Sequence, residues 1–273
     1  MYRILSAFRF LPPESRLKSC VAVLRNSGLS EYKGEPLPCD AIDNYAEVLA
    51  DGKNYSAGNA VKLMRKTLSE NDKIDIICVG PSCNIAGLMD NLADEYSDKN
   101  GMELIKEKVG RLYIMGGAFV FKEGEKPFAE WNVEQDVPSA KKTFDKFPSE
   151  IVVVPSEAGA RVATIAETTK GLTRKAMEVF FKTGDRRNGI KYEENPERTR
   201  PSWDPLTCMA AIGADEYTYS EYGKVDVSGN GITKFKKEKT EKCRYMTMHN
   251  DFKKAEKKLN DYLKSLTRSG EKA

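Results

Sequence analysis

Three short apolar runs constrain the fold of this chain more than any other feature of its sequence. They are residues 74–79, 112–115 and 151–155, and none shows the strict polar alternation of a half-exposed strand. Runs of this kind are typical of strands that are buried on both faces. Segments with apolar residues at helical spacing separate them, and strands that alternate with helices predict a parallel sheet. The sequence therefore predicts an α/β fold with a mostly parallel central sheet and helices on both faces.

Apolar residues recur at helical spacing between and after these runs. In residues 58–70, for example, Val61, Met64 and Leu68 share one face. The polar residues 183–202 predict a long loop that is either functional or a surface excursion. The predicted helices are residues 58–70, 84–96, 138–147, 160–183, 204–211 and 251–266, and short strands with glycine turns are predicted within residues 217–235.

Length and charge limit the classes of protein to which the chain can belong. At 273 residues it can form one large core, so we predict a single domain over residues 1–273, with residues 1–14 as a divergent start and residues 250–273 as a C-terminal helix and tail. Its 44 basic and 41 acidic residues give a net charge of +3, which is no electrostatic footprint for nucleic acid. We interpret the Lys-rich residues 251–266 as a solvated helix. The sequence has no apolar run of about 18 residues, so no membrane span is predicted.

The cysteines indicate reduced, mostly buried thiols. The six cysteines form no C-x-x-C pair, and His249 is the only histidine. A structural zinc site needs four ligands with close pairs, so the sequence predicts no zinc site. The first ten residues do not read as a signal peptide, and we expect a cytoplasmic protein. A His-dependent catalytic triad could be built only around His249.

Polar and glycine-rich segments follow the predicted strands. Residues 80–84 follow the first run, residues 116–117 follow the second, and Glu130 and Asn132 come soon after. Residues 203–205 (Trp-Asp-Pro) begin a later predicted helix. Because right-handed crossovers place the carboxyl ends of parallel strands on one rim, we expect a ligand site there. Glu130 and Asn132 are the strongest candidates, since a polar pair buried beside apolar strands requires a partner.

In this order and spacing, the segments resemble motifs of the inosine-uridine preferring nucleoside hydrolase family. The matching segments are residues 80–84 for a Gly-Pro-Leu-Thr-Asn-like turn, 115–117 for Met-Gly-Gly, 129–132 for Ala-Glu-Phe-Asn, 136–140 for Asp-x-x-Ala-Ala, 151–155 for a valine-rich strand and 203–205 for a late His-Asp-Pro or Trp-Asp-Pro. Each motif alone is unspecific, whereas all of them in the correct order are specific. The resemblance extends from about residue 15 to the C-terminus and implies a hydrolase of the N-glycosidic bond of ribonucleosides, here with a preference for purines.

The resemblance also implies roles for individual residues. In the family, aspartates and the ribose hydroxyls hold a calcium ion, and an aspartate activates the attacking water. By this resemblance Asp204 would bind calcium through its carboxylate and Val79 through its backbone carbonyl, which suits a cation that prefers oxygen ligands. The family tends to form dimers or tetramers, which implies a homo-oligomer. The residues implied to bind a small-molecule ribonucleoside are Asn84, Met115, Glu130, Asn132 and Trp203.

Several of these residues also have a plainer interpretation. Asp204 could be only the N-cap of its helix, because Asp before Pro is a common helix start. Trp203 and Trp131 could be ordinary core aromatics rather than a stacking platform for a base. Asn84 could be a cap or turn residue with no ligand contact.

The amino-terminal part departs from the family's pattern. The family begins with a strand that ends in Asp-x-Asp-x-x-x-Asp-Asp, which supplies two calcium ligands and the catalytic base. Residues 1–24 contain no Asp, and residues 2–10 are more similar to the family's second strand. Residues 40–44 echo the motif but follow no predicted strand, and we interpret them as a coincidence. We therefore expect a truncated or degenerate member that lacks the first strand and helix, with no catalytic base identified and impaired cleavage.

Three functional hypotheses follow from these observations. The first is a nucleoside hydrolase homologue whose cleavage of purine ribonucleosides is weak or absent. The second is a non-catalytic pseudoenzyme that binds a nucleoside or ribose through Glu130, Asn132 and Trp203. The third is a scaffold partner of a complete homologue. Binding of calcium and of ribonucleosides distinguishes the three.

Overall fold

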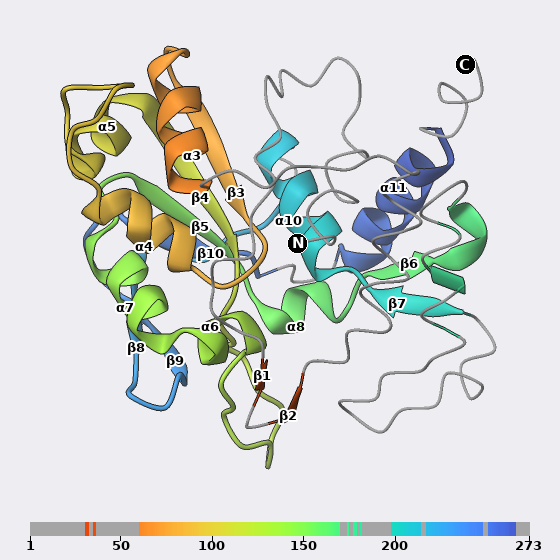
Figure 1. The fold of residues 1–273 in the computed structure, drawn as a ribbon. Helices are drawn as coiled ribbons and strands as arrows, with labels where there is room; N and C mark the ends of the chain where they lie inside the picture. Colours follow the sequence, from red (N-terminus) through yellow and green to blue (C-terminus); the bar gives the residue numbers. More distant parts are fainter. Residues whose placement is uncertain are drawn as a thin grey trace.

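The computed structural model describes residues 60–169, 198–213, 217–247 and 251–265, together with residues 31–32, 35–36, 174, 177–178 and 181. At the centre of these residues lies a six-stranded sheet with the order β3-β4-β5-β10-β8-β9 (Figure 1). The first four strands in this order are parallel, and β8 and β9 are antiparallel to their neighbours. The strands are β3 (Ile74–Cys78), β4 (Val109–Met115), β5 (Glu150–Val154), β10 (Cys243–Tyr245), β8 (Gly223–Val227) and β9 (Thr233–Lys237).

Helices cover both faces of the sheet, which confirms the predicted mostly parallel α/β architecture (Figure 1). Alternate residues of β4 and β5 point to opposite sides: Leu112 and Ile151 belong to the core on one face, and Tyr113 and Val152 to the core on the other. The first core is completed by α3 (Ala60–Ser69), α4 (Cys83–Asp90), α5 (Gly101–Lys108) and α7 (Val137–Lys146). The second core is completed by α10 (Trp203–Ile212) and α11 (Phe252–Ser265).

Smaller elements connect the sheet to its surroundings. They are β1 (Glu31–Tyr32), β2 (Glu35–Pro36), α6 (Trp131–Gln135), α8 (Ser156–Gly159), β6 (Ala163–Ile165), the 3₁₀ turn η1 (Ala166–Thr168) and β7 (Thr199–Pro201). The pairs β1–β2 and β6–β7 are both antiparallel and lie outside the central sheet. None of the helices in the described part of the chain is long and apolar enough to cross a membrane.

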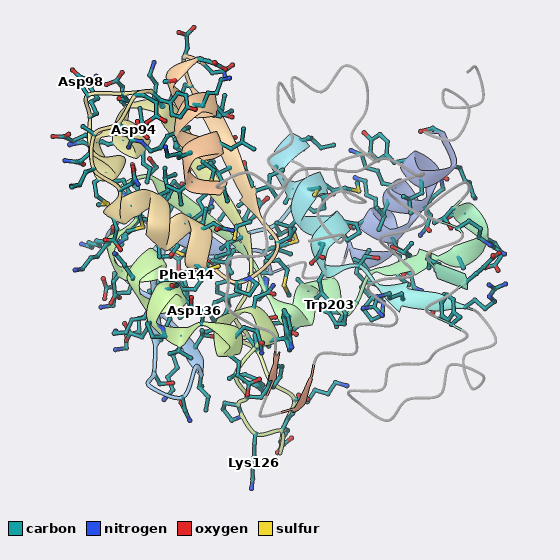
Figure 2. The ribbon with its side chains drawn as sticks, viewed as in Figure 1. Asp94, Asp98, Lys126, Asp136, Phe144 and Trp203 are labelled. Carbon is teal, nitrogen blue, oxygen red and sulfur yellow. The ribbon has the colours of Figure 1, made fainter. Side chains whose placement is uncertain are left out.

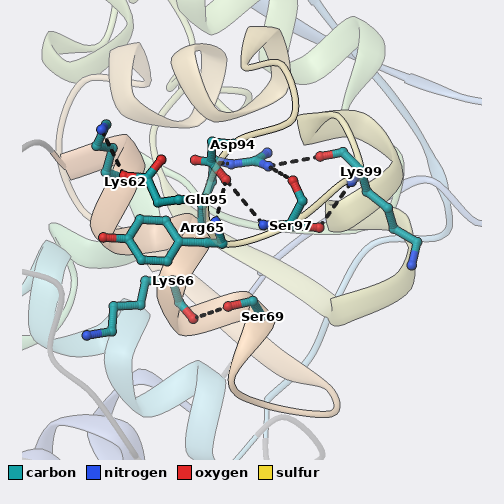
Figure 3. Close-up of polar contacts among 9 residues, drawn as sticks. Lys62, Arg65, Lys66, Ser69, Asp94, Glu95, Ser97 and Lys99 are labelled. Atoms are coloured by element: carbon teal, nitrogen blue, oxygen red, sulfur yellow. Dashed lines mark hydrogen bonds and ion pairs between the residues drawn. The ribbon is translucent and has the colours of Figure 1, made fainter.

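The helix predicted over residues 84–96 is wrong in its second half. α4 ends at Asp90, and Leu92, two residues beyond it but within the predicted range, is 76% exposed. The buried Arg65 explains the break (Figure 3): its guanidinium pairs with Asp94 at 2.7 Å. It also donates hydrogen bonds to the carbonyl oxygens of Ser97 and Lys99. These contacts fix residues 94–99 in a non-helical path, because a buried charge needs this many partners.

A helix that the sequence analysis did not predict, α5, follows this loop. Asn100 accepts a hydrogen bond from the backbone N–H of Glu103, and the Glu103 carboxylate accepts one from the backbone N–H of Asn100. This reciprocal capping box is a signal that could have identified the helix from its sequence.

The helix predicted over residues 160–183 is wrong at its start. Residues 163–165 form β6 instead, which pairs with β7. The hydroxyl groups of Thr164 and Ser202 lie 2.6 Å apart and join the two segments further. Residues 174, 177–178 and 181 are helical, and the rest of this range after residue 169 lies outside the described residues.

Several other predictions also lie outside the described residues. They concern residues 1–14, the strand-like residues 2–10, residues 40–44, most of the loop at residues 183–202 and the end of the C-terminal tail. The single-domain assignment for residues 1–273 stays a prediction. The remaining predicted helices are confirmed within a few residues at each end, as α3, α7, α10 and α11. The short strands predicted within residues 217–235 correspond to β8 and β9, and β9 extends two residues further, to Lys237.

Candidate functional site

The carboxyl ends of β3 and β4 form the centre of the candidate site. Val79 follows β3 and Met115 ends β4, and both are buried in a small apolar cluster that also contains Trp203, the first residue of α10. The ends of the neighbouring parallel strands β3 and β4 thus lie next to the first residue of α10, although α10 is far away in sequence. This is the rim on which the sequence predicted a ligand site.

Glu130 is buried at the start of α6, next to the end of β4. Its Oε2 atom accepts hydrogen bonds from the backbone N–H groups of Asn132 (3.0 Å), Gly117 (3.3 Å) and Val133 (3.4 Å). The side chain therefore caps α6 and holds the turn after β4 at the same time. Among the described residues, none donates a hydrogen bond to Oε1, so this oxygen retains its acceptor capacity.

Burial raises the pKa of Glu130 to about 7. The three N–H donors act in the opposite direction, because they favour the ionised form, and the negative charge of Asp204 adds to the increase. A carboxyl group with this pKa is partly protonated near neutral pH, so it can both accept and donate a hydrogen bond.

Asn132 connects α6 to the end of β4. Its Nδ2 atom donates to the backbone carbonyl of Met115 at 3.0 Å and lies 3.0 Å from the Met115 sulfur. The amide is only 7% exposed, and no described residue donates to its Oδ1 atom. Glu130, Asn132 and Met115 are therefore one packed unit, as expected if all three belong to one site.

Trp203 lies beside α8, at the amino end of α10 (Figure 2). Its indole Nε1–H donates to the backbone carbonyl of Ser156 at 2.9 Å, which fixes the plane of the ring. Gly159 allows this close packing, because a Cβ atom there would lie 2.3 Å from Cδ1 of Trp203. The indole is partly buried and packs against the cluster of Val79 and Met115.

Asp204 follows Trp203 in the first turn of α10. Its charge contributes to raising the pKa of both Glu130 and Cys78, which places its carboxylate near the ends of β3 and β4. The N-cap position of α10 belongs to Ser202 rather than to Asp204. Asp204 is therefore not the N-cap residue of its helix, and its role as a calcium ligand stays a prediction.

Asn84 is less closely connected to the site. It is the second residue of α4, and the cap position belongs to Ser82, so Asn84 does not cap the helix. No hydrogen bond within the described part of the chain joins its side chain to Glu130 or Asn132. Its role in ligand binding stays a prediction.

The described residues do not by themselves make a calcium site. Within the described ranges there is no group of three or more His, Cys, Asp or Glu side chains that could hold a metal ion. The donors predicted from the sequence are one carboxylate, on Asp204, and the backbone carbonyl of Val79. Calcium takes about 6–8 oxygen ligands, so these two donors are too few without further oxygens.

Two residues next to the site were missed by the sequence analysis. Glu157 lies in α8 and accepts hydrogen bonds from the backbone N–H groups of Phe119 and Val120, both at 3.0 Å. Thr233 begins β9 and exchanges hydrogen bonds with the N–H and the carbonyl of Ala118. Glu157 follows a predicted strand directly and could have been found by the rim argument. Thr233 carried no signal, because it lies 115 residues from its partner.

The sheet and its two helical layers define an α/β protein with a mostly parallel central sheet, and a buried polar pair at the strand ends marks a candidate ligand site on the carboxyl rim. A model of the inosine-uridine preferring nucleoside hydrolase family matches residues 13–260, so the chain belongs to this family. No curated protein sequence matches the chain significantly.

Solved nucleoside hydrolase structures share the fold of this chain. A plant nucleoside hydrolase, PpNRh1, is 17% identical with a TM-score of 0.57, over 80% of this chain and 71% of that one. An inosine-uridine preferring nucleoside hydrolase from Bacillus anthracis is 19% identical with a TM-score of 0.55, over 86% and 76%. An inosine-guanosine nucleoside hydrolase is 14% identical with a TM-score of 0.55, over 78% and 68%. At these identities the likeness shows the fold alone.

Proposed function

We propose that the protein binds purine ribonucleosides on the carboxyl rim of the sheet, and that the residues of this sequence alone cleave the N-glycosidic bond weakly. The observation that carries the proposal is the hydrogen bonding of the Glu130 and Asn132 side chains. Each side chain is fixed by hydrogen bonds through one atom, while Glu130 Oε1 and Asn132 Oδ1 accept none from the described residues. Both side chains retain a small exposed fraction, 5% and 7%. Ribose hydroxyl groups are suitable donors for such preorganised oxygens.

Trp203 supports a preference for a nucleoside over free ribose. Its ring is held by the Ser156 carbonyl and lies against Val79 and Met115 at the same rim. A fixed aromatic face can stack on a purine base, and such a stack contributes about 1–3 kcal/mol. The family and its relatives include proteins named for inosine and guanosine, which supports the same class of ligand.

The residues at the rim explain binding better than they explain bond cleavage. Glu130 and Asn132 would orient the ribose, and Met115 would exclude water from one side of the sugar. In calcium-dependent members of the family the ion polarises the ribose hydroxyls, and here Asp204 and the Val79 carbonyl would be its protein ligands. Since two donors do not complete a calcium site, we assign no chemical step to the ion. A general base contributes about 10²–10⁴-fold to a rate, and the sequence analysis identified none.

A second candidate function, nucleoside binding without cleavage, is favoured by the same shortage of carboxylates. It predicts a measurable affinity for inosine and no release of hypoxanthine. A third candidate, a scaffold for a complete homologue, predicts no affinity for either inosine or ribose. A homo-oligomer and a cytoplasmic location are proposed from the family resemblance and from the thiols.

Isothermal titration with inosine and with ribose, each with calcium and with a chelator, tests the proposal. We expect inosine to bind more tightly than ribose, and chromatography to detect slow release of hypoxanthine that depends on calcium. Asp204→Ala should abolish the calcium dependence, whereas Asp98→Ala, an exposed aspartate far from the rim (Figure 2), should leave it unchanged. Absence of binding under all four conditions would overturn the proposal. Binding without turnover would favour the second candidate.

A further inference from the structure

The five residues after β4, residues 116–120, are held mainly by side chains from other parts of the chain, together with backbone hydrogen bonds to Val154 and Ser156. The N–H of Gly116 bonds to the carbonyl of Val154. The next four N–H groups bond to side-chain oxygens: Gly117 to Glu130, Ala118 to Thr233, and Phe119 and Val120 to Glu157. Each N–H of the segment thus has a defined acceptor, although the segment belongs to no helix or strand.

Gly117 connects this segment to the ribose-binding pair. Its N–H donates to the same Oε2 atom of Glu130 that caps α6, so a shift of Gly117 moves or weakens the hold on that carboxylate. Gly117 itself has φ of +76°, and a Cβ atom there would lie 3.0 Å from the Phe119 ring and 3.1 Å from Thr233. A side chain at this position would therefore be strained and crowded. The carbonyl of Gly117 accepts a hydrogen bond from the backbone N–H of Ser156, the neighbour of Glu157 in sequence.

Glu157 holds the far end of the segment. Its Oε1 atom accepts both N–H groups, and its Oε2 atom is buried without a hydrogen-bond partner in the described part of the chain. A half-buried carboxylate of this kind is costly, and burial raises its pKa. The ring of Phe119 also packs on Tyr245 and Phe235, with centroids 4.9 and 6.0 Å away. The aromatic packing alone could fix the side chain of Phe119, but only Glu157 orients the two N–H groups.

We propose that Glu157 and Thr233 are positioning residues for the nucleoside site: they fix residues 116–120 and thereby the carboxylate of Glu130. This inference rests on the proposed function, since it assigns these two residues a role in nucleoside binding. We call Glu157 and Thr233, with their hydrogen bonds to residues 118–120, the clamp. Neither residue touches the proposed ligand-binding atoms, and both act through Gly117. A merely structural role would affect stability and leave the affinity of the folded protein unchanged.

The first test measures inosine affinity and thermal stability together in the full chain. Glu157→Ala removes both acceptors and should weaken inosine binding at least tenfold, while Glu157→Gln, which keeps one acceptor oxygen, should recover most of the affinity. Thr233→Val removes the two hydrogen bonds to Ala118 at similar volume and should also weaken binding, with Thr233→Ser as its conservative rescue. Glu123→Gln, an exposed change of the same charge in the adjoining loop, is the matched control. Lower stability with unchanged affinity in both the Glu157 and Thr233 variants would overturn the proposal.

The second test does not depend on any ligand. Amide hydrogen exchange measured by NMR should accelerate at Gly117 and Asn132 in Glu157→Ala and in Thr233→Val, although both N–H groups bond to Glu130 and not to residue 157 or residue 233. Acceleration confined to Ala118, Phe119 and Val120 would overturn the positioning role. If the unsubstituted protein binds neither inosine nor ribose, the proposed function fails, and the exchange at Gly117 and Asn132 still decides whether the clamp positions Glu130.

Discussion

Two glutamates at opposite ends of the parallel strands, Glu150 and Glu130, have contrasting hydrogen-bond and ion-pair partners. Glu150 begins β5 at the amino ends of the parallel strands. Its carboxylate accepts hydrogen bonds from Arg111 (2.7 Å) and the hydroxyl of Tyr222 (3.1 Å) and forms an ion pair with Arg244 (2.9 Å). Two cations therefore balance one anion, and both carboxylate oxygens are used. A carboxylate with this many partners stabilises the amino end of its strand, and few of its acceptor sites remain for a ligand.

Glu130 lies at the carboxyl rim and has only neutral N–H donors around one of its oxygens. No Lys or Arg of the described ranges pairs with it, and the nearby charge of Asp204 is of the same sign. Burial alone therefore does not identify a functional carboxylate. A buried carboxylate whose charge lacks a cation, and whose second oxygen lacks a donor, is the better candidate.

Replacement of Glu130 should have the largest effect of the changes that test this comparison. Glu130→Ala leaves three buried N–H groups without their acceptor, and each such loss costs about 1–3 kcal/mol. We expect inosine affinity to fall at least about 100-fold, which corresponds to about 3 kcal/mol, with a lower midpoint of chemical denaturation. Titration calorimetry and urea denaturation measure the two effects. Unchanged affinity in the folded variant would remove Glu130 from the site.

The pH dependence of stability should distinguish the two glutamates next. The pKa of Glu130 is about 7 in the folded protein against an ordinary 4.5, so the folded state holds this proton more tightly. Its stabilising contribution is complete below about pH 4.5 and is lost as the pH rises through about 7, by up to about 3 kcal/mol. Urea denaturation at several pH values should show this fall, and Glu130→Gln should flatten it. A slope that Glu130→Gln leaves intact would assign the proton to another group.

Replacement of Glu150 should affect stability without affecting the site. Glu150→Gln removes the charge that pairs with Arg111 and Arg244, both partly exposed, so we expect a loss of about 1–2 kcal/mol. Inosine affinity should stay within twofold of the unsubstituted protein, about 0.4 kcal/mol. Urea denaturation and titration calorimetry give both values. A large loss of affinity would show that the two edges of the sheet are coupled.

The smallest expected effect concerns the indole ring of Trp203. Trp203→Ala should weaken inosine binding about tenfold more than ribose binding, because stacking contributes only with the base. Parallel titrations with the two ligands measure the difference. Equal losses for inosine and ribose would indicate that the ring only supports the rim through its contact with the Ser156 carbonyl.

The sequence was sufficient to predict the parts of the fold that depend on local patterns. Apolar runs gave β3, β4 and β5, and periodicity gave α3, α7, α10 and α11. It failed where long-range contacts decide the backbone path, as at Arg65, which ends the helical course before Asp94. It also missed β10, a three-residue strand whose place between β5 and β8 depends on its neighbours.

For the candidate site, the sequence placed Glu130 and Asn132 at the correct strand end, and the structure brings them together with Met115 and Trp203. It could not show that Glu157 and Thr233 hold the adjoining segment. Glu157 lies 37 and 38 positions along the chain from its two partners, and Thr233 lies 115 positions from Ala118. No short-range sequence pattern indicates contacts between residues so far apart.

The hydrogen bonds between Ala118 and Thr233, together with the bridge between Ala129 and Ile232, have a consequence for how the protein matures. The segment that adjoins Glu130 receives its last anchors from a hairpin made more than a hundred residues later. During synthesis at about 5–20 residues per second, the core around β4 and β5 can form several seconds before that hairpin leaves the ribosome. The candidate site around Glu130 should therefore become fully ordered only after this hairpin has been made.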